Sequence, residues 1–455
     1  MNIGEIISLS EPQLQFSTGR HNLAIDPRFG LKSFHPLDYN TGRRDFSIID
    51  IGVIAKEDDV GEVLSLLSDL NKNFKPRTRG SGVEYIGFGN IYKVPINIPE
   101  IGDRKVITIS NTDINKALRG EDAFYNIKNL YNSKIQQYVD ENRERGVLII
   151  QISEDFEKYF KFNYEDLRTH IKALCIKKHV FAQILTQNSL QAFDSCDNMW
   201  NLSLGLYVKA GGVPWKLKIG EEGTCFIGIA FGIKKSADGQ DILVGLAEVF
   251  DLFGESVTIK VVEDSFDTEV GYYLSTEKAE KLIRTAIESY INEKRENPRK
   301  VIIHKTTFFN LNEQTGIENA LGDISYDLVH IKLNTSLRLV PDDKYPPQRG
   351  TFWKIDDKRG ILYTVGKIEE FGTYPGPGTP SAIEISRDEG STDTERLAKQ
   401  ILDLAKMDWN TTVLMSKEPI TIKFARKVSD VLKAGVEPEE ILKDFRYYIY
   451  SYSRD

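Results

Sequence analysis

Apolar residues recur every three to four positions in several long stretches of the chain, which is the spacing of one face of an α-helix. This spacing predicts helices over residues 60–74, 124–138, 164–178, 276–295, 392–406 and 421–434. Short runs of consecutive apolar residues lie between these stretches and are typical of strands that are buried on both faces. The runs predict strands at Val147–Ile152, Val180–Thr186, Cys225–Phe231, Ile242–Phe250, Val301–His304 and Leu328–Leu333.

The order of these elements predicts an α/β fold with two domains. In the first half, helices and buried strands alternate, with Gly146 expected to end a helix, and this rhythm indicates a Rossmann-like parallel sheet. In the second half, two long strands joined by a turn at 234–241 precede alternating helices and strands, which indicates a mixed sheet. The Gly- and Pro-bearing stretch Lys209–Trp215 interrupts the pattern. We therefore expect one domain over 1–215 and a second over 216–455.

Composition narrows the cellular setting. The 455 residues are 40% hydrophobic and 28% charged, the balance of a soluble globular chain. No apolar run approaches the ~20 residues needed to cross a bilayer, and the first residues lack a secretion signal. The three cysteines have neither an even number nor CxxC spacing, which disfavours a disulfide framework or a zinc site. We expect a cytoplasmic protein without membrane insertion.

Net charge excludes one class of nucleic-acid binder. The 59 Lys and Arg residues against 67 Asp and Glu residues give a charge of 59 − 67 = −8. Proteins that coat nucleic acid without sequence preference are usually basic, because their affinity comes from neutralised phosphates. Any nucleic-acid site on this chain must therefore be a local basic groove.

Common catalytic motifs are missing from the sequence. It contains no HExxH, no GxSxG and no pair of histidines with metal-ligand spacing. The Gly-Pro loop at 372–380 lacks both a following Lys-Ser/Thr and a GxGxxG register, so we interpret it as a turn and not as a phosphate-binding loop.

Eight segments, taken in order along the chain, resemble short prokaryotic Argonautes. They are Glu11–Phe16, Leu167–Lys172, Phe181–Gln183, Lys209–Trp215, Cys225–Ile229, Val301–His304, Met407–Asn410 and Pro419–Ile422. The most specific are the Lys-x-Gly-Gly-x-Pro-Trp and Asp-Trp-Asn segments, and the resemblance covers nearly the whole chain. It implies a MID domain that holds the 5′ end of a guide strand, followed by an RNase H-like PIWI domain that cradles the guide–target duplex.

Four polar residues form the candidate guide pocket. Arg168 and Lys172 are four residues apart and share one helix face, which by itself would also fit a solvated basic surface. Gln183 and Lys209 follow in the order of the family's pocket pattern, so the resemblance implies that all four hold a 5′-phosphate. Cations with an amide donor suit such a group. Arg168 stands where the family has an aromatic residue or His, and a guanidinium plane can also stack on a base.

The resemblance also implies an inactive PIWI domain. RNase H-type cleavage needs carboxylates that hold two Mg²⁺ ions about 4 Å apart. Ala230 and Thr306 occupy the positions where slicing Argonautes carry aspartates. Glu248 and Asp251 are close in sequence to the predicted strand Ile242–Phe250, and we expect both carboxylates at the surface. We therefore expect no catalysis by this chain, with an active guided endonuclease using non-standard carboxylates as the alternative.

Partners follow from the resemblance alone. It implies a guide RNA, complementary single-stranded DNA from a plasmid or phage as target, and a separate APAZ-bearing effector of the sirtuin-like, TIR or nuclease type, acting in prokaryotic defence. Some Argonautes bind Mg²⁺ beside the guide phosphate through their terminal carboxylate. In this sequence six residues follow Ile449, where the resemblance to the family's C-terminus ends. Gly205 also stands where a ligand side chain can lie, and a glycine has none. A stand-alone protein that binds a small phosphorylated ligand at Lys209–Trp215 is a third hypothesis.

Overall fold

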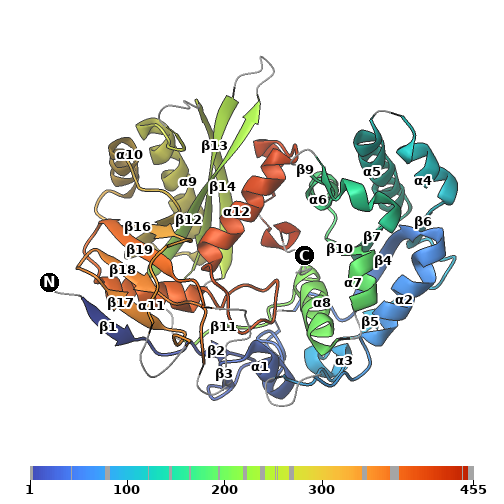
Figure 1. Ribbon diagram of the computed structural model, residues 1–455, viewed down its shortest axis with the longest axis horizontal. Helices are drawn as coiled ribbons and strands as arrows, with labels where there is room; N and C mark the ends of the chain where they lie inside the picture. Colours follow the sequence, from blue (N-terminus) through green and yellow to red (C-terminus); the bar gives the residue numbers. More distant parts are fainter. Residues whose placement is uncertain are drawn as a thin grey trace.

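Two β-sheets lie on opposite sides of the molecule, with helices between and around them (Figure 1). The computed structural model describes residues 4–42, 44–76, 82–120, 122–142, 146–162, 165–192, 195–218, 223–235, 241–251, 253, 255–265, 271–340, 346–368, 379–442 and 444–448. None of the described helices is long and apolar enough to cross a membrane.

The smaller sheet is the parallel sheet expected from the first half of the sequence. Its strand order is β10–β7–β4–β5, and β6 also pairs with β4. Helices α2 and α8 pack on one face and α4, α5 and α6 on the other, which explains why β7 is buried along its whole length. The bounds are β4 Ile49–Lys56, β5 Ile96–Asn97, β6 Val106–Ile109, β7 Val147–Ile152, β10 Ala182–Thr186, α2 Val60–Asp69, α4 Asn111–Leu118, α5 Ala123–Glu141, α6 Leu167–Lys177 and α8 Cys196–Lys209.

The larger sheet is mixed, as expected, and has nine strands in the order β1–β17–β18–β19–β16–β15–β12–β13–β14. Strands β12, β15 and β16 are parallel to one another, and the other pairs are antiparallel. The bounds are β1 Glu5–Ser8, β12 Thr224–Lys235, β13 Asp241–Phe250, β14 Ser256–Ser265, β15 Lys300–Lys305, β16 Ser325–Lys332, β17 Thr351–Lys354, β18 Arg359–Leu362 and β19 Ile383–Glu389.

Smaller elements complete the fold. A three-stranded sheet runs β11–β2–β3, and β8 pairs with β9. The bounds are β2 Leu14–Gln15, β3 Leu23–Ala24, α1 Pro27–Phe34, α3 Phe88–Tyr92, β8 Lys161–Phe162, β9 Glu165–Asp166, α7 Gln187–Ala192, β11 Lys216–Leu217, α9 Thr276–Lys294, α10 Leu311–Leu321, α11 Thr394–Leu404 and α12 Ile420–Lys433.

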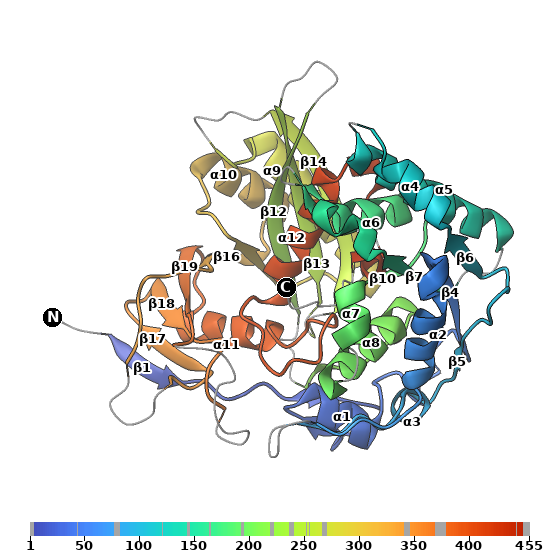
Figure 2. The ribbon, with the colours of Figure 1, turned by 45° about the vertical axis from the view of Figure 1, so that its right-hand side comes forward.

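Helix α12 crosses one face of the larger sheet and also contacts α6 of the smaller domain, so it lies at the junction (Figures 1 and 2). A Cβ on Gly228 of β12 would lie 1.9 Å from the carbonyl oxygen of Thr421. Glycine at this position therefore lets the first turn of α12 rest directly on the strand. Helices α9 and α10 cover the opposite face of the sheet.

Several predicted boundaries were wrong for identifiable reasons. The helix expected over 60–74 ends at Asp69, and Phe74 instead forms a β-bridge with Tyr85. Gly146 does not end α5, which stops at Glu141. A Cβ on Gly146 would lie 1.8 Å from the carbonyl oxygen of Asp50, so this glycine lets the backbone approach strand β4 closely. Most of the turn at 234–241 and of the loop at 372–380 lies outside the described residues.

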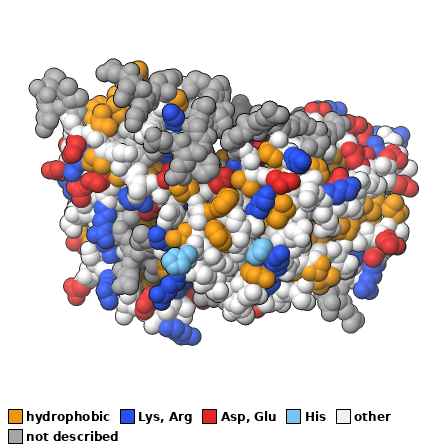
Figure 3. Space-filling view, turned by 90° about the horizontal axis from the view of Figure 1, so that it is seen from below, with side chains coloured by type: hydrophobic (Ala, Val, Ile, Leu, Met, Phe, Trp, Pro, Cys, Tyr) orange, Lys and Arg blue, Asp and Glu red, His pale blue; other side chains and the backbone are white. Residues whose placement is uncertain are grey.

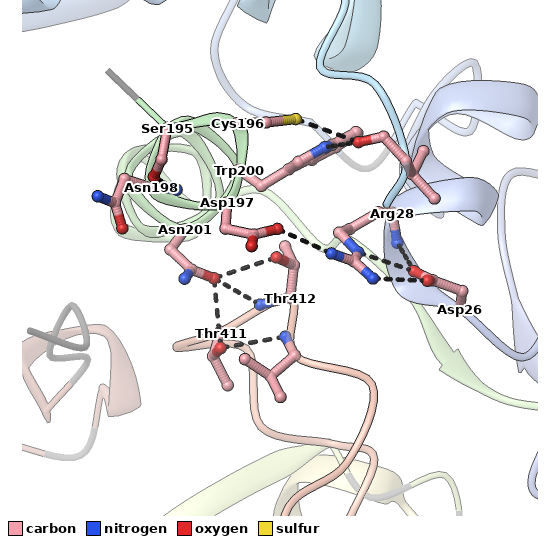
Figure 4. A network of polar contacts seen from close by, with 12 residues as sticks. Asp26, Arg28, Ser195, Cys196, Asp197, Asn198, Trp200, Asn201, Thr411 and Thr412 are labelled. Atoms are coloured by element: carbon pink, nitrogen blue, oxygen red, sulfur yellow. Dashed lines mark hydrogen bonds and ion pairs between the residues drawn. The ribbon is translucent and has the colours of Figure 1, made fainter. Parts of the chain in front are cut away.

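Helix α8 was not predicted, and side chains at both domains hold it in place (Figure 4). Its residues are buried on nearly all sides, so it lacks the apolar stripe that marks an amphipathic helix. Asp197 accepts a hydrogen bond from Arg28 at 2.9 Å, which ties the helix to the N-terminal segment. Asn201 Oδ1 accepts a bond from the backbone N–H of Thr412 at 2.9 Å, which ties it to the loop after α11. These contacts fix the helix that ends in Lys209.

Candidate anion-binding site at the domain junction

Three of the expected pocket residues lie together on α6, β10 and α8. Lys209 Nζ donates a hydrogen bond to Gln183 Oε1 at 2.7 Å. Lys172 Nζ donates to the carbonyl oxygen of Ala182 at 2.9 Å, one residue before Gln183 on the same strand. Lys172 and Lys209 are 1% and 0% exposed, so two ammonium groups are buried against one strand.

Burial of these lysines disfavours their charged forms. It lowers the pKa of Lys172 to about 8. It lowers the pKa of Lys209 well below its usual value, and repulsion from Lys172 and Lys427 adds to the effect. A buried anion would reverse both effects, because it would neutralise the ammonium groups in a medium where charge interactions are strong.

Helix α12 contributes two lysines that we did not assign to the pocket. Lys427 interacts electrostatically with Lys172 and Lys209, and burial lowers the pKa of Lys427 to about 7 although Asp408 favours its charge. Lys423 forms an ion pair with Asp408. The two lysines are four residues apart in a predicted helix, the same spacing that singled out Arg168 and Lys172. That signal was therefore available in the sequence.

Asp408 stabilises the positive charge on α12. It is 4% exposed, and its Oδ1 accepts hydrogen bonds from the backbone N–H and the side-chain amide of Asn410 at 3.1 and 2.5 Å. Burial raises its pKa, but Lys423 and Lys427 outweigh burial and hold the pKa of Asp408 well below its usual range. The Asp-Trp-Asn segment thus places an ionised carboxylate beside the lysines.

Arg168 lies one helical turn before Lys172, at the start of α6. Its Nε is 3.6 Å from Oδ1 of Asp166, the residue that caps the helix by accepting from the backbone N–H of Arg168. Its side chain is 22% exposed, in contrast to the buried Lys172. Arg168 is therefore the more exposed of the two basic residues on this helix face.

The Gly-Gly turn after α8 is filled by the protein's own side chains. Gly211 has φ +105°, and a Cβ on it would lie 2.9 Å from Arg446 Nη1. A Cβ on Gly212 would lie 2.3 Å from the ring of Tyr207. Asp38 accepts from the backbone N–H of Val213 at 3.0 Å and pairs with Arg44 at 3.0 Å. The glycines accommodate these neighbours, so the turn positions Lys209 and offers little room for a ligand of its own.

The expectation of Mg²⁺ beside a guide phosphate stays a prediction. The described residues contain no group of three or more His, Cys, Asp or Glu residues that could hold a metal ion. A Cβ on Gly205 would lie 3.3 Å from Gln183 Oε1, so this position faces the pocket without a ligand side chain. The ammonium groups repel cations, and the tail beyond 448 lies outside the described residues.

The two positions that the resemblance marks as degenerate catalytic residues are Ala230 and Thr306. Ile229 of β12 is in register with Lys305, the last residue of β15, so Ala230 continues β12 and Thr306 directly follows the end of β15. Ala230 is half-buried and Thr306 is exposed. Neither side chain carries the negative charge with which a carboxylate binds Mg²⁺.

The expectation that Glu248 and Asp251 lie at the surface was wrong. Glu248 is 0% exposed, because α12 covers its face of β13. Asp251 is 3% exposed and accepts hydrogen bonds from the backbone N–H of Phe253 at 2.9 Å and from Lys294 at 2.7 Å. Asp251 therefore stabilises the turn into β14, whereas Glu248 is enclosed at the domain junction.

The buried lysines predict a pH-dependent stability of the guide-free protein. Between pH 8 and 10.5 the unfolded chain retains the proton of Lys172 while the folded protein has released it, so stability rises with pH. Thermal or urea unfolding should show that the stability gained by Lys172→Met at pH 7 shrinks by about 2 kcal/mol at pH 9.5. Lys177→Met, from a more exposed position of α6, is the control. An equal gain in stability from Lys172→Met at both pH values would contradict the lowered pKa of Lys172.

One face of the molecule carries surface charges of both signs. On the face shown in Figure 3, Lys and Arg side chains are interspersed with Asp and Glu side chains. Such a mixture does not favour a polyanion over that face. A local and buried concentration of positive charge agrees with the acidic net charge of the chain.

Comparisons with known proteins identify the fold. No protein-family model and no curated protein matches the sequence. Clostridium butyricum Argonaute, solved with a guide DNA and a 19-mer target DNA, matches 98% of this chain with a TM-score of 0.71 and 18% identity. Drosophila Piwi matches 98% of this chain with a TM-score of 0.65 and 14% identity. Marinitoga piezophila Argonaute, solved with a 5′ OH guide RNA, matches 98% of this chain with a TM-score of 0.61 and 14% identity.

The likeness covers only part of those proteins. The chain spans 55% of the Clostridium protein, 56% of Piwi and 59% of the Marinitoga protein. In this chain the matching part contains a parallel sheet followed by a mixed sheet, and the lysine cluster lies at their junction. The chain therefore has the fold of the MID and PIWI half of an Argonaute.

Proposed function

We propose that this chain holds a guide RNA by its 5′-phosphate and uses the guide's bases to recognise complementary single-stranded DNA. The observation that carries the proposal is a cluster beside Gln183 of two buried lysines, Lys172 and Lys209, and the half-buried Lys427. Three ammonium groups that repel one another are costly to bury unless they serve an anion. A terminal phosphate with nearly two negative charges meets that requirement.

The chemistry of the guide end follows from this charge and not from the fold. One of the similar structures holds a guide RNA with a 5′ hydroxyl, so the fold alone does not imply a 5′-phosphate. A neutral hydroxyl would leave the ammonium groups of Lys172 and Lys209 uncompensated, whereas a phosphate would neutralise them. The choice of RNA as guide and DNA as target rests on the resemblance to short Argonautes.

Substitution of the pocket lysines tests guide loading. Lys172→Ala or Lys209→Ala should weaken binding of a 5′-phosphorylated guide by ~1.5–3 kcal/mol, because each removes a charge-assisted hydrogen bond. Binding of the same guide with a 5′ hydroxyl should change much less. Fluorescence anisotropy with both guides measures the difference, and Lys177→Ala on the same helix is the matched control. Equal affinity of the wild type for the two ends would refute the phosphate pocket.

We also propose that the chain recognises its target without cutting it. Two-metal hydrolysis needs carboxylates at the positions that Ala230 and Thr306 occupy, and an alanine and a threonine supply no negative charge. Glu248 is too enclosed to bind a hydrated metal ion, since α12 covers it.

Incubation of the guide-loaded chain with complementary DNA tests this directly. In Mg²⁺ or Mn²⁺ the target should remain intact while binding to the complex, because no carboxylate pair holds the ions. Gel electrophoresis of labelled target measures both results, and a target with scrambled sequence serves as control. A product cut at a fixed distance from the guide's 5′ end would establish the alternative, a guided endonuclease.

A recognition chain without its own chemistry needs a partner that acts. The resemblance supplies the class: an APAZ-bearing effector of the sirtuin-like, TIR or nuclease type in defence against plasmids or phage. A permanent complex of this kind buries on the order of 2,000 Å² or more. Guide and target would favour one arrangement of the complex over another and so activate the effector.

Effector activity in the reconstituted complex measures this coupling. Activity should be low with guide RNA alone and should rise when complementary single-stranded DNA is added, because only the paired complex favours the active arrangement. NAD consumption reports a sirtuin-like or TIR effector, and degradation of a non-target nucleic acid reports a nuclease. Identical activity with and without target would leave this chain as a guide holder only.

A further inference from the structure

Strand β1 forms one edge of the nine-stranded sheet, and among the described residues no strand pairs with its outer side. Its residues, Glu5–Ser8, pair on the inner side with β17 in a continuous register. Figures 1 and 2 both show β1 at the outer margin of the molecule. An edge strand presents backbone N–H and C=O groups that can pair with another extended chain. The geometry of β1 therefore suits the addition of a further strand.

The side chains of β1 lack the usual protection of an exposed edge. Ile6 is 63% exposed, and the strand contains no Lys, no Pro and no β-bulge. Natural proteins use such features to keep sheet edges from pairing with other chains. Strand β1 is therefore an edge that permits association with a further chain and offers it an apolar side chain.

Ile6 borders a small apolar cluster that is separate from the main cores. It is in register with Trp353 of β17, which is in register with Ile361 of β18. Side chains at such cross-strand positions share one face of the sheet. Ile361 and Tyr363 are buried in the small cluster, and Trp353 packs against it. A further strand would place a side chain beside Ile6 and so extend this cluster.

Glu5 carries the only charge on β1. Its cross-strand neighbour is Lys354, whose Nζ lies 2.7 Å from Oδ2 of Asp393 at the start of α11. In the part of the chain that the structure describes, Glu5 forms no ion pair of its own. Opposite charges at cross-strand positions stabilise a sheet. The edge therefore favours an incoming strand with Lys or Arg beside Glu5 and an apolar residue beside Ile6.

A second copy of this chain fits the edge less well than a different protein does. Strand β1 contains no basic residue, so β1 of a second copy would bring no cation to Glu5. Pairing of two such short strands would also bury far less than the roughly 1,200 Å² at the lower end of stable interfaces. A different protein that contacts further surfaces can use β1 as one part of a larger interface.

We propose that a partner protein adds a strand to β1, with a basic residue beside Glu5 and an apolar residue beside Ile6. The inference rests on the proposed function, which calls for a partner, and deepens it by naming the surface that the partner uses. Main-chain hydrogen bonds to β1 supply binding, and the two side-chain positions supply specificity. The larger sheet thus continues into the partner.

Amide hydrogen exchange of the complex with the APAZ-bearing effector tests the strand addition. Peptides that cover Glu5–Ser8 should exchange at least about tenfold more slowly in the complex than in the chain alone, because new backbone hydrogen bonds protect the outward N–H groups. Ile6→Lys places a charge in the interface and should weaken effector binding by about tenfold. Ile101→Lys, at an isoleucine of the smaller domain that is 75% exposed, is the matched control and should bind like wild type.

Reversal of the charge on β1 tests the chemistry of the partner strand. Glu5→Lys should weaken effector binding, more at low salt than at high salt, because it turns an attraction to the partner's basic residue into a repulsion. Glu100→Lys, from an exposed turn of the smaller domain, is the control for the change in net charge. If Ile6→Lys does not fold, Glu5→Lys and the exchange of the wild-type complex decide.

The results distinguish this inference from the proposed function. If the effector binds while Glu5–Ser8 exchange as fast as in the chain alone, the partner stands and strand addition to β1 fails. If protection arises in the chain alone and grows with its concentration, a second copy occupies the edge and the inference is wrong. If no complex with the effector forms, the proposed partnership fails and the inference fails with it, whereas guide and target binding are measured without the effector.

Discussion

Burial of like charges at a junction between two domains is the constraint on which the rest of this structure depends. Lys172 and Lys209 come from the smaller domain and Lys427 from the larger one. Lys172 and Lys427 disfavour the charged form of Lys209, and Lys172 disfavours the charged form of Lys427. Their mutual repulsion opposes the docking of α12 beside α6. Apolar packing of α12 over the larger sheet holds the helix in place and offsets that repulsion. This repulsion is an electrostatic strain that a bound anion would relieve.

The scaffold around the cluster serves to keep the ammonium groups close. Helix α8 is anchored by Arg28 on one side and by Thr412 on the other, and these contacts hold in place the backbone that carries Lys209. Pre-organised charge of this kind binds a ligand more tightly than mobile side chains do, because little ordering remains to be done.

The sequence allowed the amphipathic helices, the fully buried strand β7 and the α/β class to be predicted, because these depend on local periodicity. Helix α8 escaped because it is buried on nearly all sides and has no polar stripe. The environment of Glu248 also escaped, since it depends on α12, which lies more than 150 residues later in the chain. Lys427 could have been recognised from its spacing to Lys423. Which charged helix faces meet across a junction is a tertiary property that no local pattern contains.

The position of strand β1 has a consequence for how the chain is assembled on the ribosome. Glu5 pairs with Lys354, while the strands of the smaller sheet lie between them in the chain. The N-terminal strand leaves the ribosome early and has no β-partner until β17 has been made. Throughout that interval the apolar Ile6 and Ile7 are without their sheet. The growing chain thus carries an unpaired strand across the synthesis of a whole domain, and β1 joins the larger sheet only after β17 has been made.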